Sequence, residues 1–143
     1  MMFAPETIDV ATWPKIYALL APEIERQGIT VTEVIDELLT NTAQLWVLRR
    51  GGDPYAVGVS RLEQTSKGLM VRAWLLAGEQ MEDWLGDLIL TVARKASEVG
   101  AVGFRLEGRP GWGPTLRKRG FKTQAVVMEK MFAPANEGVC HRL

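Results

Sequence analysis

The stretch Val71–Glu107 constrains the fold of this chain more than any other part of its sequence. Two short apolar runs flank a tight turn, Gly78–Gln80, and a long segment that closes at Gly100, where helices commonly end on a left-handed residue. The long segment carries apolar side chains at the three- and four-residue steps of an amphipathic helix: Met81, Trp84, Leu85, Leu88, Val92, Ala96 and Val99. Two strands around such a helix predict a parallel βαβ unit: Val71–Ala77, Met81–Val99 and Val102–Glu107.

The βαβ unit predicts an α/β protein with a mixed sheet, and it also predicts where a ligand binds. In such folds the usual ligand site is the mouth between the strand ends and the N-terminus of the helix. Free backbone N–H groups point into that mouth. We therefore expect any site beside the turn Gly78–Gln80.

The N-terminal part of the chain predicts a helix from about Thr12 to Gly28. Thr12 is a suitable N-cap, and Gly28 is a suitable stop. Pro22 interrupts the apolar pattern, so we expect a kink or a break near Leu20.

A second helix and an antiparallel meander follow. The helix begins at Thr30 or Thr32 and closes at Asn41–Thr42. Gly51–Pro54 and Gly68 are typical of turns and mark the ends of strands. We predict three antiparallel strands here: Gln44–Arg49, Tyr55–Glu63 and Val71–Ala77.

The part of the chain after the βαβ unit begins with a dense signature, Gly108–Pro114, in which Trp112 is either a plug over the core or an exposed interface anchor. The signature leads into a short helix, Thr115–Arg119, and then into a final strand, Phe121–Phe132, antiparallel to its neighbour. Residues 133–143 lack periodicity and predict a loose tail. We therefore predict a single domain, residues 1–132, followed by this tail.

The bulk composition excludes several function classes. A chain of 143 residues with 47% hydrophobic content can bury one sizeable core. Seventeen Lys and Arg balance seventeen Asp and Glu, so the total charge predicts no attraction to nucleic acid or to a membrane. The single cysteine, Cys140, cannot form an internal disulfide, which fits a cytoplasmic setting. We find no signal peptide, no run long enough to span a bilayer and no cluster with metal-ligand spacing.

The order of these elements, a meander feeding a βαβ unit and a short helix before a last strand, resembles the GNAT (Gcn5-related N-acetyltransferase) fold. More specifically, the chain is similar to the small GNAT-like proteins encoded among head and tail assembly genes of tailed bacteriophages. The likeness runs from about Trp13 to Phe132, although a short or absent first strand departs from the general plan. Three groups of residues carry it: Leu45–Val47; Trp74–Gly78 with Met81–Leu85; and Gly108–Trp112 with Leu116, Gly120 and Phe121. It implies a protein partner, either a phage structural protein or a host protein, and a place in the host cytoplasm or on the virion.

The resemblance also implies an acetyl-CoA site at the mouth. In that family the end of the central strand binds the pantetheine arm, which points to the run Leu75, Leu76, Ala77 and Gly78, and a glycine-rich turn binds the pyrophosphate. Here one glycine remains, and three acids lie in or next to the turn: Glu79, Glu82 and Asp83. At about 4 to 6 Å and an effective dielectric constant near 20, each acid opposes a phosphate by about 3 to 4 kcal/mol before screening. We therefore expect a degenerate site and no cofactor.

The sequence also offers few candidate catalytic residues. The family commonly uses a Glu on the meander as base and a Tyr on the late helix as acid, but no tyrosine lies between Gly108 and Lys122. Glu63 lies beside a hairpin turn, and nothing near His141 in the tail orients its ring. The remaining candidate is a basic group, either solvated or forming an anion site: Arg109, Arg117, Lys118, Arg119 and Lys122.

Three hypotheses follow from these residues. The first is a phage-encoded interaction or virion assembly factor that catalyses no reaction. The second is an active acetyl-CoA-dependent N-acetyltransferase in which Arg109 and Arg117 hold the phosphates in place of the glycine turn. The third is a binder of small anions or nucleotides at the same mouth.

Overall fold

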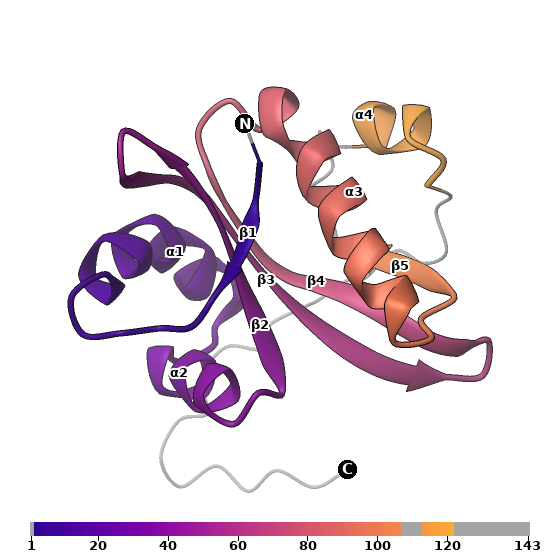
Figure 1. The fold of residues 1–143 in the computed structure, drawn as a ribbon, viewed down its shortest axis with the longest axis horizontal. Helices are drawn as coiled ribbons and strands as arrows, with labels where there is room; N and C mark the ends of the chain where they lie inside the picture. Colours follow the sequence, from indigo (N-terminus) through magenta and orange to yellow (C-terminus); the bar gives the residue numbers. More distant parts are fainter. Residues whose placement is uncertain (1, 107–112, 122–143) are drawn as a thin grey trace, which may run out of the picture.

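The computed structural model describes residues 2–106 and 113–121, arranged around a five-stranded sheet (Figure 1). In chain order the elements are β1 (Ala4–Glu6), α1 (Trp13–Gln27), α2 (Val31–Leu39), β2 (Ala43–Arg50), β3 (Asp53–Thr65), β4 (Gly68–Gly78), α3 (Met81–Glu98), β5 (Gly103–Leu106) and α4 (Gly113–Lys118). The strands lie in the order β1-β2-β3-β4-β5, and all neighbours are antiparallel except β4 and β5, which are parallel. The predicted α/β class, the meander and the parallel βαβ unit are thus confirmed. The predicted final strand, apart from its first residue, and the tail lie outside the described residues.

Helices cover both faces of the sheet. Figure 1 shows α1 and α2 on one face and α3 on the other. Successive side chains of a strand point to opposite faces, so Leu45 and Val47 pack under α1 and α2 while Trp46 and Leu48 pack under α3. Val99, predicted on the inward stripe of α3, follows the helix as its C-cap and is 61% exposed. Met81 is partly buried. The rest of that stripe is buried as predicted: Trp84, Leu85, Leu88, Val92 and Ala96.

The first helix is one continuous element. α1 runs through Pro22, so of the kink or break expected near Leu20 the break is wrong, and the kink stays a prediction. Ile16, Leu20 and Ile24 form one buried face at four-residue spacing. Burying each contributes about 1.5 to 3 kcal/mol, and together they exceed the roughly 3 kcal/mol that an interior proline costs. Gly28 ends the helix with a φ of 70°, as predicted.

A carboxylate takes the place of the expected threonine cap at the start of α1. Thr12 occupies the N-cap position, but its side chain makes no capping hydrogen bond. The Oδ1 atom of Asp9 instead accepts hydrogen bonds from the backbone N–H groups of Ala11 (2.8 Å) and Thr12 (2.9 Å). The bond from Thr12 is the main cause that holds the pKa of Asp9 below its ordinary value.

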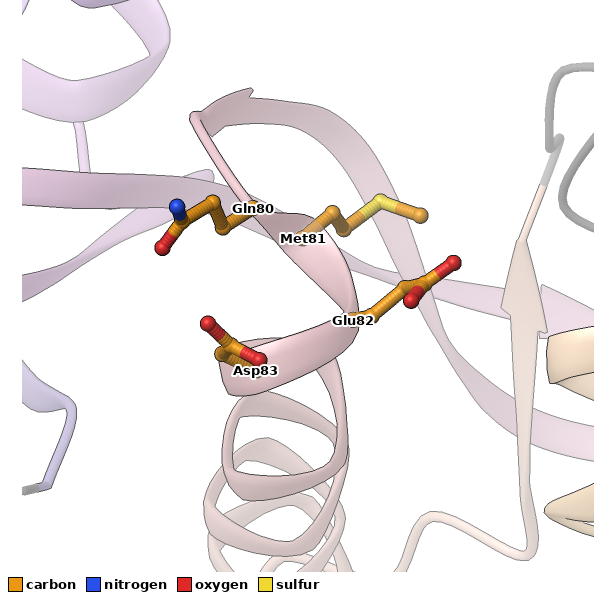
Figure 2. A pocket seen from close by; sticks show the side chains of 4 residues that line it. All are labelled: Gln80, Met81, Glu82 and Asp83. Atoms are coloured by element: carbon orange, nitrogen blue, oxygen red, sulfur yellow. The ribbon is translucent and has the colours of Figure 1, made fainter.

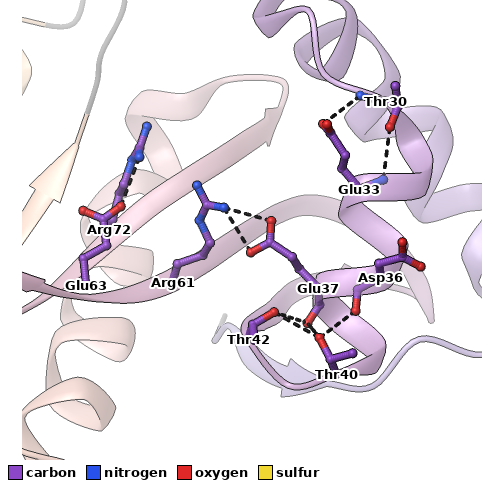
Figure 3. A network of polar contacts seen from close by, with 9 residues as sticks. All are labelled: Thr30, Glu33, Asp36, Glu37, Thr40, Thr42, Arg61, Glu63 and Arg72. Carbon is purple, nitrogen blue, oxygen red and sulfur yellow. Dashed lines mark hydrogen bonds and ion pairs between the residues drawn. The ribbon is translucent and has the colours of Figure 1, made fainter.

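Charged contacts fix α2 against the sheet (Figure 3). The helix begins with a capping box, which confirms the first of the two predicted starts: Thr30 Oγ1 accepts from the N–H of Glu33, and the Glu33 carboxylate accepts from the N–H of Thr30, both at 3.1 Å. From β3, Arg61 donates two hydrogen bonds to the Glu37 carboxylate (2.8 and 3.0 Å). The same guanidinium lies 4.1 Å from the ring centre of Trp74. These contacts tie α2 to β3, and through Arg61 they reach Trp74 in β4, the strand that lines the site.

Candidate functional site

Within the described residues, β4 pairs with β5 at one end. The parallel pairing covers Met70–Ala73 and reaches Leu106, the last described residue before the gap at 107–112. Just beyond it the register with β3 shifts between Val59 and Ser60 and leaves Trp74 with no residue opposite it. A bulge of this kind bends a strand and increases its twist. Beyond Trp74, therefore, no other described strand pairs with the β5-facing edge of β4.

Side chains from α1 brace this bend. The Nε2 atom of Gln27 donates to the carbonyl of Trp74 (2.8 Å) and to Oε1 of Glu23 (3.0 Å). Glu23 is only 4% exposed, and its carboxylate also accepts from Nη2 (2.5 Å) and Nε (3.0 Å) of Arg26. Because a buried carboxylate is tolerated only when it is paired and hydrogen-bonded, this network allows a charge to sit next to the bulge.

A cleft of about 270 Å³ lies between α1, the end of β4 and the start of α3. Its described lining is mostly apolar and includes one charged residue, Glu23; the lining residues are Leu19, Pro22, Glu23, Leu76, Ala77, Gly78, Met81 and Trp84. Ligand pockets commonly begin at about 300 Å³. The cleft therefore suits a thin chain or a single side chain better than a compact ligand.

The turn between β4 and α3 has a fixed shape. Gly78 has a φ of 142°, and a Cβ atom there would lie 2.9 Å from Cβ of Ala56. At the next residue, the carbonyl of Glu79 accepts a hydrogen bond from Nε1 of Trp84 (2.8 Å). Close packing alone therefore requires the one glycine that remains in this turn, and no ligand is needed to explain it.

A hollow of about 500 Å³ opens at the N-terminus of α3 (Figure 2), and its lining residues are Gln80, Met81, Glu82 and Asp83. The side chains of Glu79, Glu82 and Asp83 are exposed, and none of them forms an ion pair with another described residue. The N–H of Asp83 donates to the carbonyl of Gln80 (2.9 Å), so one donor of the first turn is already used. Negative charge at this end stabilises the helix dipole and opposes an anionic ligand.

The residues predicted to bind a cofactor fall in different places. Leu76, Ala77 and Gly78 line the cleft, whereas the Leu75 side chain is fully buried in the core under α1 and α2. Arg117 is exposed on α4, and Arg109 lies outside the described residues. The cofactor role of these residues stays a prediction.

Part of the predicted basic group packs against α3. The guanidinium of Arg119 lies directly against Gly86, where a Cβ atom would clash with it. Arg117 and Lys118 are exposed at the end of α4. Lys122 and Trp112 lie outside the described residues.

The candidate acids and bases do not meet in the cleft. Glu63 lies near the opposite end of β3, where it accepts a hydrogen bond from Arg72 (3.1 Å) and approaches Arg105 (3.8 Å). The Tyr55 hydroxyl reaches the mouth and donates to Oε1 of Gln80 (3.2 Å). His141 and Cys140 lie outside the described residues. Within residues 2–106 and 113–121, no His, Cys, Asp and Glu side chains group to hold a metal, and no helix is long and apolar enough to cross a membrane.

The sequence-based prediction missed Glu23, Gln27 and Tyr55. Glu23 follows Leu20 by three residues and therefore falls on the buried stripe of α1. A charged residue on an apolar helix face is the signal that could have found it. Tyr55 reaches Gln80 only because the end of β4 pairs with the start of β3. This strand register cannot be derived from a single sequence.

A mixed sheet with one parallel pair of strands, helices on both faces and α3 starting at the end of β4 gives this chain the fold of the GNAT acetyltransferases. Glucosamine-6-phosphate N-acetyltransferase from Arabidopsis thaliana superposes with a TM-score of 0.63 at 14% identity, over 93% of this chain and 100% of that one. A predicted acetyltransferase with acetyl-CoA from Clostridium acetobutylicum gives 0.64 at 14%, over 91% and 96%. The aminoglycoside acetyltransferase meta-AAC0020 from an uncultured soil metagenomic sample, in complex with sisomicin, gives 0.65 at 12%, over 92% and 97%.

The likeness to these structures establishes the fold alone, because the sequence identities are low. No protein-family model matches the chain, and no curated protein matches its sequence. Function therefore has to be argued from the residues of the site.

Proposed function

We propose that this chain is a GNAT-fold protein with a degenerate acetyl-CoA site, acting as a noncatalytic interaction factor. The observation that carries the proposal is the start of α3, where Glu79, Glu82 and Asp83 are exposed and make no ion pair within the described part of the chain. A pyrophosphate bound there would meet three negative charges at the end where the fold needs free N–H groups. Screening reduces each repulsion, but a loss of about 1.4 kcal/mol already weakens binding tenfold.

The shape of the turn supports the same proposal. Gly78 is required by its contact with Ala56, and the indole of Trp84 already binds the turn at Glu79. The turn is therefore stabilised by the protein itself and does not depend on a bound phosphate. Of the described candidates for acid and base, Glu63 pairs with Arg72, the Tyr55 hydroxyl bonds Gln80 at the mouth, and neither belongs to the described lining of the apolar cleft.

We further propose that the protein is phage-encoded, acts in the host cytoplasm or on the virion, and binds a phage structural protein or a host protein. The support is the likeness of Trp74–Leu85 and Gly108–Trp112 to the small GNAT-like proteins of phage assembly gene clusters. The test is a tagged chain expressed during infection. Recovery of a capsid or tail protein with it supports the assembly role, and recovery of no virion or host protein contradicts it.

Thermal unfolding with acetyl-CoA tests the loss of the cofactor site. A ligand at about 100 times its Kd stabilises the folded state by about 2.7 kcal/mol, which raises the unfolding temperature by several degrees. We expect no shift at millimolar acetyl-CoA. A shift of several degrees that saturates with concentration would contradict the proposal.

The second candidate is an active N-acetyltransferase with acetyl-CoA as cofactor, and the apolar cleft beside the end of β4 favours it. In this case Arg117, together with Arg109, would supply the phosphate contacts that the acidic turn lacks. The candidate predicts thermal stabilisation by acetyl-CoA that is lost in Arg117→Ala and kept in the neighbouring control Lys118→Ala. Absence of any shift in the unchanged protein rules it out.

A further inference from the structure

We propose that Phe3 and β1 together form a detachable strap, which controls the shape of the mouth through the contact between Phe3 and Trp84. The strap lies beside the start of α3 (Figure 1). The inference does not depend on the proposed function, which concerns the binding of acetyl-CoA. It concerns how the turn before α3 is held and how the apolar cleft is opened.

The strap has few contacts with the sheet. β1 is three residues long, it pairs with β2, and no other described strand lies on its outer side. Ala4 and Pro5 are exposed. One ion pair reinforces the pairing, because the Glu6 carboxylate accepts hydrogen bonds from Nη2 (2.7 Å) and Nε (3.0 Å) of Arg49. Segments with few contacts open at a lower cost in free energy than the core, so the strap leaves the sheet while the rest of the protein stays folded.

One buried side chain fixes the strap to the core. Phe3 lies directly before β1, is 2% exposed and belongs to the core cluster beneath α3. The centre of its ring lies 5.7 Å from that of Trp84, at an interplanar angle of 59°. Aromatic pairs at this distance and tilt attract one another beyond the effect of the area that they bury. Release of the strap removes this contact from Trp84.

Trp84 connects the strap to the mouth. Its Nε1 atom donates a hydrogen bond to the Glu79 carbonyl (2.8 Å), and the same residue lines the cleft of about 270 Å³. One side chain therefore touches the strap, the turn and the cleft. Neighbouring groups move into a space that a buried side chain vacates. Loss of Phe3 thus frees the indole to leave the turn, and it enlarges a cleft that is just below the size of common ligand pockets.

Hydrogen exchange of the Trp84 indole N–H, followed by NMR, tests this coupling. Phe3→Ala should speed the exchange of the indole about tenfold or more relative to that of the backbone amide of Val92, which is buried further along α3. Val34→Ala is the matched control and should leave this ratio unchanged, because Val34 is fully buried in the other core cluster. The same ratio in both variants would overturn the inference, since it would show only a general loss of stability.

A milder variant weakens the strap and keeps Phe3. Glu6→Gln removes the ion pair with Arg49 and should speed exchange of the Trp84 indole about two- to fivefold. Asp53→Asn removes an exposed ion pair outside the strap and is the matched control, which should exchange as the unchanged protein does. Equal rates in Glu6→Gln and Asp53→Asn would overturn the inference.

A disulfide that locks the strap tests the opposite direction. Ala4 and Val47 are direct partners in the antiparallel pairing of β1 and β2, and the Cα spacing of such partners suits a disulfide. The variant combines Ala4→Cys and Val47→Cys with Cys140→Ser, which removes the single natural cysteine. The oxidised protein should exchange the Trp84 indole more slowly than the same protein after reduction. Equal rates in the two forms would show that the turn does not depend on the strap and would overturn the inference.

Discussion

Replacing Gly78 by alanine should be among the most damaging single-methyl changes in the site. Its φ of 142° is one that L-residues rarely adopt, and the new Cβ would lie 2.9 Å from Cβ, and 3.0 Å from Cα, of Ala56. It would also lie 3.1 Å from the carbonyl oxygen of Tyr55. Two of these three atoms are backbone and cannot rotate away. Strained backbone costs about 1 to 3 kcal/mol and overpacking costs about 1 to 3 kcal/mol, so we expect unfolding free energy to fall by about 2 to 6 kcal/mol.

Gly100→Ala separates the two contributions. Gly100 also has a positive φ, 94°, but no atom lies within 4 Å of the position that a Cβ would take. This control therefore measures backbone strain alone, and chemical denaturation should show Gly78→Ala to be less stable than Gly100→Ala by about 1 to 3 kcal/mol. Equal losses in the two variants would refute the close contact between β4 and β3 from which the fixed shape of the turn is argued.

Three further changes test contacts at the ends of the helices. Trp84→Phe removes the indole donor to the Glu79 carbonyl and should lower the unfolding free energy by about 1 to 3 kcal/mol in chemical denaturation. Thr30→Ala removes the capping box of α2 and should cost about 0.5 to 2 kcal/mol in the same assay. Asp9→Asn should destabilise at neutral pH. Because the folded-state pKa of Asp9 is lowered, its contribution is present above the unfolded pKa and lost as pH falls through the folded one, so urea midpoints of the two proteins should converge in acid.

The βαβ unit was predictable because its helix and strands carry their own signals. The inward stripe of α3 is set by helical spacing, and Gly100 marks its end, so the boundaries of α3 agree with the prediction to within one residue. The first helix shows where local signals fail. Pro22 argues for a break, but tertiary burial of Ile16, Leu20 and Ile24 decides the outcome.

The position of the candidate site could be predicted, but its composition could not. The mouth beside Gly78 follows from the topology of any parallel βαβ unit, and two hollows lie there. The bulge at Trp74 and the approach of Tyr55 to Gln80 depend on strand register, which a single sequence does not state. Glu23, in contrast, could have been predicted, because the spacing of the apolar residues alone places it on the buried stripe of α1.

The most direct test of the central claim is an isothermal titration of acetyl-CoA into the unchanged protein and into the triple variant Glu79→Gln, Glu82→Gln, Asp83→Asn. The proposed function is that negative side chains at the start of α3 exclude a phosphate-bearing cofactor. It predicts no saturable heat for the unchanged protein at millimolar acetyl-CoA and at least tenfold tighter binding by the triple variant, since removing about 1.4 kcal/mol of repulsion is enough for that change. A micromolar Kd for the unchanged protein would contradict it.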